Sequence, residues 1–241
     1  MSKLEEFLNE LAAFHGEGLF NPWSEYDPVH DISSSAPSIR LLNLRTYLAE
    51  RIESAEMCLI AEAPGFRGAK FSGIAMCSER FLLENNEDLV SPHPVFNGPK
   101  QRTSNSSGAV KIPSSGMIEP TASIVWGRLM GMGISTRSWV NWNALAIHPY
   151  KPGEMMSNRT PKECEVTAGL HILELFLKLF SGRRIIAVGN IAANTLDLLG
   201  QKADKVRHPA NGGASKFAAQ FCALRGGLHA ETCFIENGWG C

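Results

Sequence analysis

The sequence lacks the signatures of several large classes of protein. No two of its six cysteines form a C-x-x-C pair, so their spacing predicts neither a zinc site nor an iron–sulfur cluster. No apolar stretch approaches the ~18 residues that cross a membrane. The first fourteen residues are acidic and amphipathic, unlike a secretory signal. We therefore expect reduced thiols, no metal, no cofactor, no membrane association and a cytoplasmic location.

The chain also has little net charge and no common nucleotide or esterase motif. Its 241 residues include 23 Lys and Arg against 24 Asp and Glu, for a formal net charge of −1. A protein that binds nucleic acid over a broad surface is usually basic, so any such contact must come from a local patch. The patterns GxGxxG, GxxxxGK[ST] and GxSxG are all absent.

Apolar runs that alternate with amphipathic segments predict an α/β core. Four short runs, at 57–61, 138–143, 184–188 and 204–206, are typical of buried parallel strands. Residues at helical spacing occupy 4–14, 39–52, 122–132, 161–180, 191–199 and 214–224. We expect one domain over residues 1–241, with an N-terminal helical arm over about residues 1–54. Its fold should have three layers, αβα, around a central, mostly parallel four-stranded sheet.

Local signals refine this outline. Thr160, with Glu163 three residues later, has the pattern of a capping box, so the long helix is expected to begin at Pro161. Ser78 has the character of a second helix N-cap. The segment 88–120 is too long for an ordinary connection, and its function stays open.

Three polar segments follow predicted strands: residues 62–73, 141–149 and 207–213. In parallel sheets ligands bind beyond the carboxyl ends of the strands, so these loops mark the candidate site. Asn143 could read the edge of a base or simply cap a turn. His208, fixed by the following proline, could stabilise an anion or pack in a turn. His148 is a second histidine at a strand end.

Together the three loops resemble the motifs of the uracil-DNA glycosylase superfamily. The first reads AEAPG and then GIAM, in the order of that superfamily's first motif, and EAPG is most similar to its iron–sulfur branch. The stretch Trp142-Asn143-Ala144 resembles the strand that ends in asparagine, and His208-Pro209 resembles the HP-loop. The likeness spans roughly residues 55–225.

The resemblance implies roles for individual residues. Asn143 would bond the Watson–Crick edge of a flipped uracil, and His208 would donate to O2 as the base leaves. Glu62 would position the attacking water. The base site would also include Ala63, Gly65, Phe71 and Met76. DNA would be contacted by Lys205, Arg207, Asn211, Gly212 and Lys216.

Several positions depart from the superfamily's pattern. Ala63 stands where many members orient water with Asp or Asn, and Glu79 is a spare carboxylate for that task. Met76 stands at the position of the aromatic that stacks on the base, which Phe66 or Phe71 could replace. Gly212 lies near the position of a leucine that classical members insert into DNA. The cysteines of the iron–sulfur branch are absent.

These observations predict a monofunctional DNA glycosylase. As a monomer, it would hydrolyse the N-glycosidic bond of a flipped damaged base, uracil first among candidates, in base-excision repair. Ala63, Met76 and Gly212 favour a second hypothesis, a catalytically weak or inactive protein on the same fold that binds nucleic acid or nucleobases. A third is an unrelated α/β hydrolase that acts on a small nucleoside, which the near-neutral charge fits and the missing GxSxG opposes.

Overall fold

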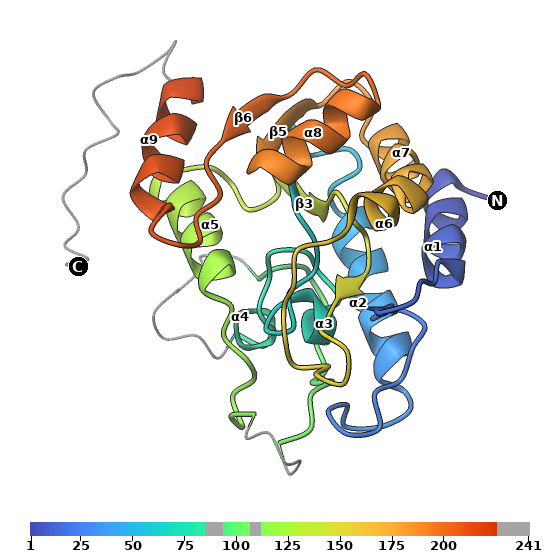
Figure 1. The fold of residues 1–241 in the computed structure, drawn as a ribbon. Helices are drawn as coiled ribbons and strands as arrows, with labels where there is room; N and C mark the ends of the chain where they lie inside the picture. Colours follow the sequence, from blue (N-terminus) through green and yellow to red (C-terminus); the bar gives the residue numbers. More distant parts are fainter. Residues whose placement is uncertain (85–93, 107–111, 226–241) are drawn as a thin grey trace.

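The computed structural model describes residues 1–84, 94–106 and 112–225. At its centre is a four-stranded sheet in the order β3-β2-β5-β6 (Figure 1). All three pairings between neighbouring strands are parallel. The predicted α/β class and parallel four-stranded sheet are therefore confirmed. The strands are β2 (Met57–Ala61), β3 (Trp139–Asn143), β5 (Arg184–Val188) and β6 (Asp204–Val206).

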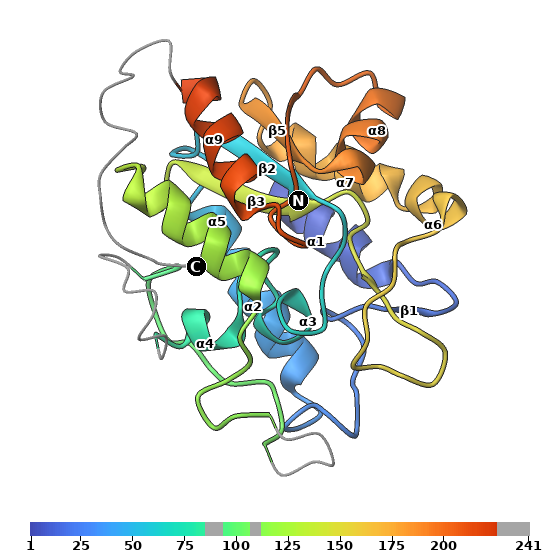
Figure 2. The ribbon, with the colours of Figure 1, turned by 60° about the vertical axis from the view of Figure 1, so that its left-hand side comes forward.

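Helices cover both faces of this sheet, which gives the predicted three layers (Figure 2). One face carries α1 (Lys3–Ala13), α7 (Leu170–Leu179) and α8 (Asn190–Leu198). The other carries α5 (Pro120–Gly131) and α9 (Ala214–Arg225). The remaining elements are β1 (Leu19–Phe20), α2 (Ala36–Ala49), α3 (Ala69–Ser72), α4 (Glu79–Leu82), β4 (His148–Pro149) and α6 (Glu163–Ala168).

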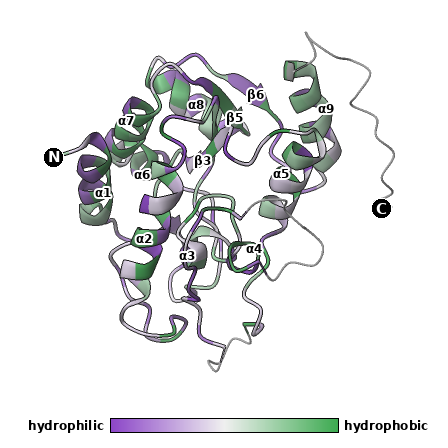
Figure 3. Cartoon of the chain, turned by 180° about the vertical axis from the view of Figure 1, so that it is seen from behind, coloured by the Kyte–Doolittle hydropathy of each residue, from purple (hydrophilic) through white to green (hydrophobic). Residues whose placement is uncertain are grey.

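Alternation along β3 sends its tryptophans to opposite faces of the sheet. Trp142 packs between Phe7 of α1 and Phe176 of α7, with ring centroids 5.2 Å away in each case. Trp139 meets Trp126 of α5 at 5.0 Å. Apolar side chains of α1 and α2 belong to the same core as the sheet. Figure 3 shows that the inner strand β5 is mostly hydrophobic, whereas the edge strand β6 is hydrophilic.

Helix α2 and the turn after it cover the free edge of β3. The Tyr47 hydroxyl accepts a hydrogen bond from the Asn141 backbone N–H at 2.9 Å. Arg51 is fully buried and donates to the backbone carbonyls of Trp139, Tyr47, Val95 and Thr136 over 2.8 to 3.1 Å. A strand edge left unpaired invites association with other chains, and these bonds prevent that here.

The helix predicted for residues 161–180 begins later and is interrupted. It starts at Glu163 with Lys162 as N-cap, and Gly169 divides it into α6 and α7. Glu165, rather than Glu163, closes the first turn by accepting from the Lys162 N–H at 2.8 Å. Arg159 holds the same carboxylate at 2.7 and 2.8 Å, which fixes the start of the helix at this point. The N-cap predicted at Ser78 is confirmed, since its side chain accepts from the Phe81 N–H.

The cysteines follow the expected pattern only in part. Cys58, Cys77 and Cys164 are free thiols. Cys222 is disulfide-bonded, so the expectation of reduced thiols is wrong there. Spacing in the sequence does not reveal which thiols folding brings together. Cys233 and Cys241 lie outside the described residues, as do residues 88–93 and 107–111 of the long connection.

Within the described part of the chain, no helix combines the length and the apolar character needed to cross a membrane. No three His, Cys, Asp or Glu side chains of residues 1–84, 94–106 and 112–225 are grouped closely enough to hold a metal ion.

Candidate functional site

Backbone hydrogen bonds bring the three predicted loops to one edge of the sheet. Asn143 is the register partner of Ala61 at the carboxyl ends of β3 and β2. Beyond them, the Leu145 N–H donates to the Glu62 carbonyl at 3.0 Å. At the ends of β5 and β6, the Gly189 N–H donates to the Val206 carbonyl at 2.9 Å. The loops that follow β2, β3 and β6 therefore open on the same side.

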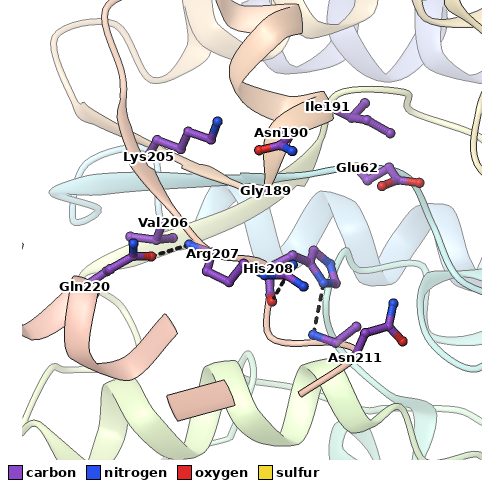
Figure 4. Close-up of a pocket in the computed structure, with 11 residues that line it drawn as sticks. Glu62, Gly189, Asn190, Ile191, Lys205, Val206, Arg207, His208, Asn211 and Gln220 are labelled. Carbon is purple, nitrogen blue, oxygen red and sulfur yellow. Dashed lines mark hydrogen bonds between the residues drawn. The ribbon is translucent and has the colours of Figure 1, made fainter. Parts of the chain in front are cut away.

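A groove of about 680 Å³ lies at this edge (Figure 4). Glu62, from the end of β2, and His208, from the end of β6, both line it. The structure thus brings together the two side chains that the sequence assigned to catalysis. Three of the five predicted DNA contacts also line the groove, namely Lys205, Arg207 and Asn211, whereas Gly212 and Lys216 are exposed beyond it. Sequence reasoning missed its other lining residues: Gly189, Asn190, Ile191, Val206, Ala210 and Gln220.

The His208 imidazole is held in one tautomer. Its Nδ1 accepts a hydrogen bond from the Ala210 backbone N–H at 3.1 Å. An accepting nitrogen carries no proton, so the proton of the neutral ring is on Nε2. Burial lowers the pKa of His208, and the positive charge of Arg207 lowers it further. The ring is therefore a neutral Nε2–H donor at physiological pH.

The backbone around His208 leaves little freedom. Gly213 passes so close to the His208 carbonyl oxygen that a Cβ added there would lie 2.0 Å from it. Gly189, with φ of +98°, packs against the His208 side chain from the other side. Asn211 adopts φ of +52°, a conformation that asparagine tolerates better than most residues. The backbone of the His208 loop is thus fixed, and the imidazole lines the groove.

Glu62 is half-buried, and burial raises the pKa of its carboxyl. A carboxylate with a raised pKa is a better base than an exposed one, because its proton affinity lies closer to the working pH. The other carboxylate considered for this task, Glu79, is fully buried and fully occupied. It accepts from the backbone N–H groups of Thr103 and Ser104 at 2.8 and 3.0 Å. Glu79 therefore anchors the 94–106 segment to α4.

Asn143 is buried, with 2% of its surface exposed, and its side-chain Nδ2 has no hydrogen-bond partner among the described residues. Two residues earlier on the same face of β3, Asn141 is fully buried, and neither of its side-chain polar atoms has a partner within residues 1–84, 94–106 and 112–225. Buried amides without partners are costly and rare. Neither residue is among those that line the groove, and amides of this kind are typical of a site that completes its hydrogen bonds with a ligand or water. Residues two apart on a strand share a face, so the sequence could have placed Asn141 on the same face of β3 as Asn143.

The first loop is fastened to the rest of the protein on two sides. His148, fully buried in β4, places Nδ1 2.8 Å from the Pro64 carbonyl oxygen. Burial lowers the pKa of His148 to about 4, so it is a neutral structural group. Lys70 of α3 is buried and bonds Asp27 of the N-terminal arm at 2.9 Å. Burial lowers the pKa of Lys70, and Asp27 opposes that shift.

The other predicted base-site residues lie in or beside this loop. Phe71 is fully buried and packs with Ile112 and Met117, which supports the simpler role of filling the loop. Met76 has φ of +48°, unusual for a residue with a side chain, and its carbonyl accepts from the Trp126 indole at 2.8 Å. Ala63 and Gly65 are half-buried. None of the four lines the groove that Glu62 and His208 share.

The His208 tautomer can be measured directly. Nitrogen-15 spectra of the imidazole at pH 7 should show a protonated Nε2 and an unprotonated Nδ1, and titration should give a pKa below the ordinary 6.5. Exposed His171 supplies a control from the same spectra. A protonated Nδ1, or a pKa above 6.5, would show that the Ala210 bond does not set the tautomer.

Sequence comparison finds no matching family model and no similar curated protein. Among solved structures, the fold is similar to the crystal structure of wild-type SMUG2 from Pedobacter heparinus, a protein of the uracil-DNA glycosylase type. The TM-score is 0.55, and the alignment covers 93% of this chain and 99% of SMUG2 at 11% sequence identity. A likeness at this identity establishes the fold alone. The chain therefore has a uracil-DNA glycosylase-like fold, with Glu62, Asn143 and His208 at the carboxyl edge of its sheet.

Proposed function

We propose that this protein is a DNA glycosylase that hydrolyses the N-glycosidic bond of a flipped damaged base, with uracil as the first candidate. The observation that carries the proposal is the neutral His208 Nε2–H, which shares a groove with the Glu62 carboxyl. The uracil-DNA glycosylase-like fold supports it, since the three loops at this edge carry the residues that the sequence resemblance assigns to the reaction.

His208 would act on the leaving base. When the bond between C1′ and the base nitrogen breaks, both electrons go to the base, and its O2 gains negative charge. A neutral Nε2–H that donates to O2 stabilises this charge, and a fixed donor needs no rearrangement as the charge develops. The lowered pKa of His208 suits that role, because it keeps the imidazole neutral, and the neutral ring still has the Nε2–H that donates to O2.

Glu62 would act on water. The sugar carbon needs a hydroxyl to replace the base, and a carboxylate that accepts one proton of a water molecule orients its oxygen toward C1′. The water oxygen bonds to C1′, one proton passes to the carboxylate and then to solvent, and the released base acquires a proton. Glu62 supplies the polar group that Ala63 lacks.

Asn143 would read the base. A side-chain amide offers one acceptor and two donors, which matches the N3–H and O4 of uracil. The unpartnered Nδ2 would gain its missing hydrogen bond from the base. Cytosine presents an amino group instead of O4 and an unprotonated N3. In the same amide orientation, the donor Nδ2 would face the amino group and the acceptor Oδ1 would face N3. Ala63, Gly65, Phe71 and Met76 complete the proposed base site by shaping the loop around it.

The DNA backbone would be held by a local patch around the His208 loop. Lys205, Arg207 and Lys216 are all exposed, as phosphate contacts require. Asn211 and Gly212 form the exposed tip of that loop and would approach the strand beside the flipped base. The patch explains how a chain of nearly neutral charge could bind DNA.

Ala63 favours a second candidate function, a protein that binds a nucleobase without cleaving it. In that case Asn143 would still complete its hydrogen bonds with a base, and Glu62 would contribute nothing to chemistry. The two functions are separated by whether an abasic site appears.

Removing His208 should abolish most of the activity while the protein stays folded. Oligonucleotides carrying uracil, hypoxanthine, xanthine or thymine mispairs are incubated with the protein, and abasic sites are then cleaved with alkali. We expect His208→Ala to lower the single-turnover rate on the preferred substrate ~10²–10³-fold, the usual effect of losing one such donor. The melting temperature of the same preparation should stay near that of wild type, and the exposed His171→Ala should leave the rate unchanged. An intact rate per folded molecule would remove His208 from the reaction.

Binding should depend on the basic patch in a way that salt reveals. Alanine at Lys205, Arg207 and Lys216 together should weaken binding to all DNA sequences and reduce the salt slope by about three, since each phosphate contact contributes ~0.9. A matched triple alanine variant at Lys3, Lys162 and Lys178, which are exposed elsewhere, should keep the wild-type slope. Equal slopes for wild type and the first variant would exclude the patch.

A further inference from the structure

A carboxyl that the sequence did not single out lies against the first loop. Glu119 immediately precedes α5, and its side chain packs on two glycines of that loop. A Cβ added to Gly68 would lie 2.4 Å from its Oε2, and one added to Gly65 would lie 3.1 Å from its Oε1. The carboxyl therefore fills space that any larger residue at position 68 would occupy, and at 65 a larger residue would crowd it.

Glu119 is half-buried, and one of its two carboxyl oxygens lacks a hydrogen-bond partner in the described part of the chain. Its Oε2 is buried, and no group within residues 1–84, 94–106 and 112–225 bonds to it. The groups around it are neutral: the two glycines, the Asn158 amide beside Gly65, and the Cys77 thiol, whose pKa burial raises. A buried carboxylate without a partner is costly, so the neutral form is favoured. Burial accordingly raises the pKa of Glu119 to about 7.

The contact lies where it can influence the site. Gly65 is three residues beyond Glu62, and the loop between them is already held by His148 at the Pro64 carbonyl. Asn158 accepts from the Phe66 N–H at 3.0 Å, so it holds the following residue as well. On β3, Trp139 contacts Trp126 of α5, and Asn143 shares the face of Trp139 by alternation. Glu119 therefore precedes the helix that packs on this face of β3, and it contacts the first loop at Gly65 and Gly68.

We propose that Glu119 is a positioning residue of the base site, whose carboxyl packs on Gly65 and Gly68 and holds the first loop, and with it Glu62, in the working geometry. The effect on activity rests on the proposed glycosylase function. The packing itself does not, and it can be tested separately.

Because the Glu119 carboxyl packs on the first loop, the position of that loop should depend on pH near neutrality. While Glu119 is protonated, the carboxyl can stay buried on the loop. Once it ionises, an unpaired charge is buried there, and the loop must shift to let water reach it. The working geometry is therefore present below a pH of about 7 and is lost above it. The free energy of unfolding also falls as pH rises. The unfolded carboxyl releases its proton near its ordinary pKa of 4.5, whereas the folded one keeps it to about 7, so stability falls between about pH 4.5 and pH 7.

The first experiment compares pH profiles of the single-turnover rate on the preferred substrate. Wild type should lose activity above pH 7 by up to tenfold per pH unit, the slope of one ionisation. Glu119→Gln keeps the shape of the side chain without the ionisation, so its profile should be flat there. The exposed Glu163→Gln should keep the wild-type profile. An alkaline loss that persists in Glu119→Gln, or is absent from wild type, would overturn the proposal.

The second experiment needs no activity. Gly68→Ala places a methyl group against the Glu119 carboxyl, so it should lower the melting temperature about twice as much in wild type as in the Glu119→Ala background, since contacting residues couple. Strain from the backbone of Gly68 is common to both backgrounds and cancels. Equal losses would overturn the packing of Glu119 on the loop. Base release that fails with every substrate, together with unequal losses, would instead reject the glycosylase function.

Discussion

The parallel pairing of β2 with β3 on one side and β5 on the other is the interaction on which the site depends. It places the ends of these strands, and that of β6 beyond β5, at one edge of the sheet. Register then places Asn143 opposite Ala61, the residue that precedes Glu62. A shift of one residue in β3 would turn Asn143 to the opposite face, toward α1 and α7, and Trp142 to the face of the site.

The site combines a fixed backbone with buried polar groups that lack hydrogen-bond partners among the described residues. The Asn143 Nδ2, the Asn141 amide and the Glu119 Oε2 are all buried without partners in the part of the chain that the structure describes. Each lowers the stability of the free protein, and the rest of the fold must compensate for that cost. Compensation comes from structures such as the aromatic core around Trp142 and the four carbonyls held by Arg51. Under the proposed function, a base that enters the site would meet groups already positioned to bond it.

Sequence reasoning identified what local pattern determines. The apolar runs at 57–61 and 184–188 gave two strands with their observed bounds, and the run at 204–206 gave the edge strand. The convergence of Glu62 and His208 on one groove followed from the rule that parallel strands end at the same edge. Long-range contacts were not accessible in this way. The pairing of β1 with β4 involves two residues on each strand, too few for a periodic signal.

The same limit applies to individual side chains. Nothing near Glu119 in the sequence indicates that it meets Gly65 and Gly68, more than fifty residues earlier. Phe71 and Glu79 have the residue types that a base site uses, yet the structure gives them packing and anchoring roles. Their partners, including Ile112 and Thr103, come from the long connection, whose path the sequence did not reveal.

The most direct test of the proposed function is a structure of the protein bound to duplex DNA that contains a deoxyuridine resistant to cleavage. If the protein has the proposed function, the uracil leaves the base stack and enters the space between Glu62, Asn143 and His208. The His208 Nε2 should then lie within hydrogen-bond distance of O2, about 2.7 to 3.2 Å, and the Asn143 Nδ2 at a similar distance from O4. A uracil that remains stacked in the duplex, or that binds away from His208, would contradict it.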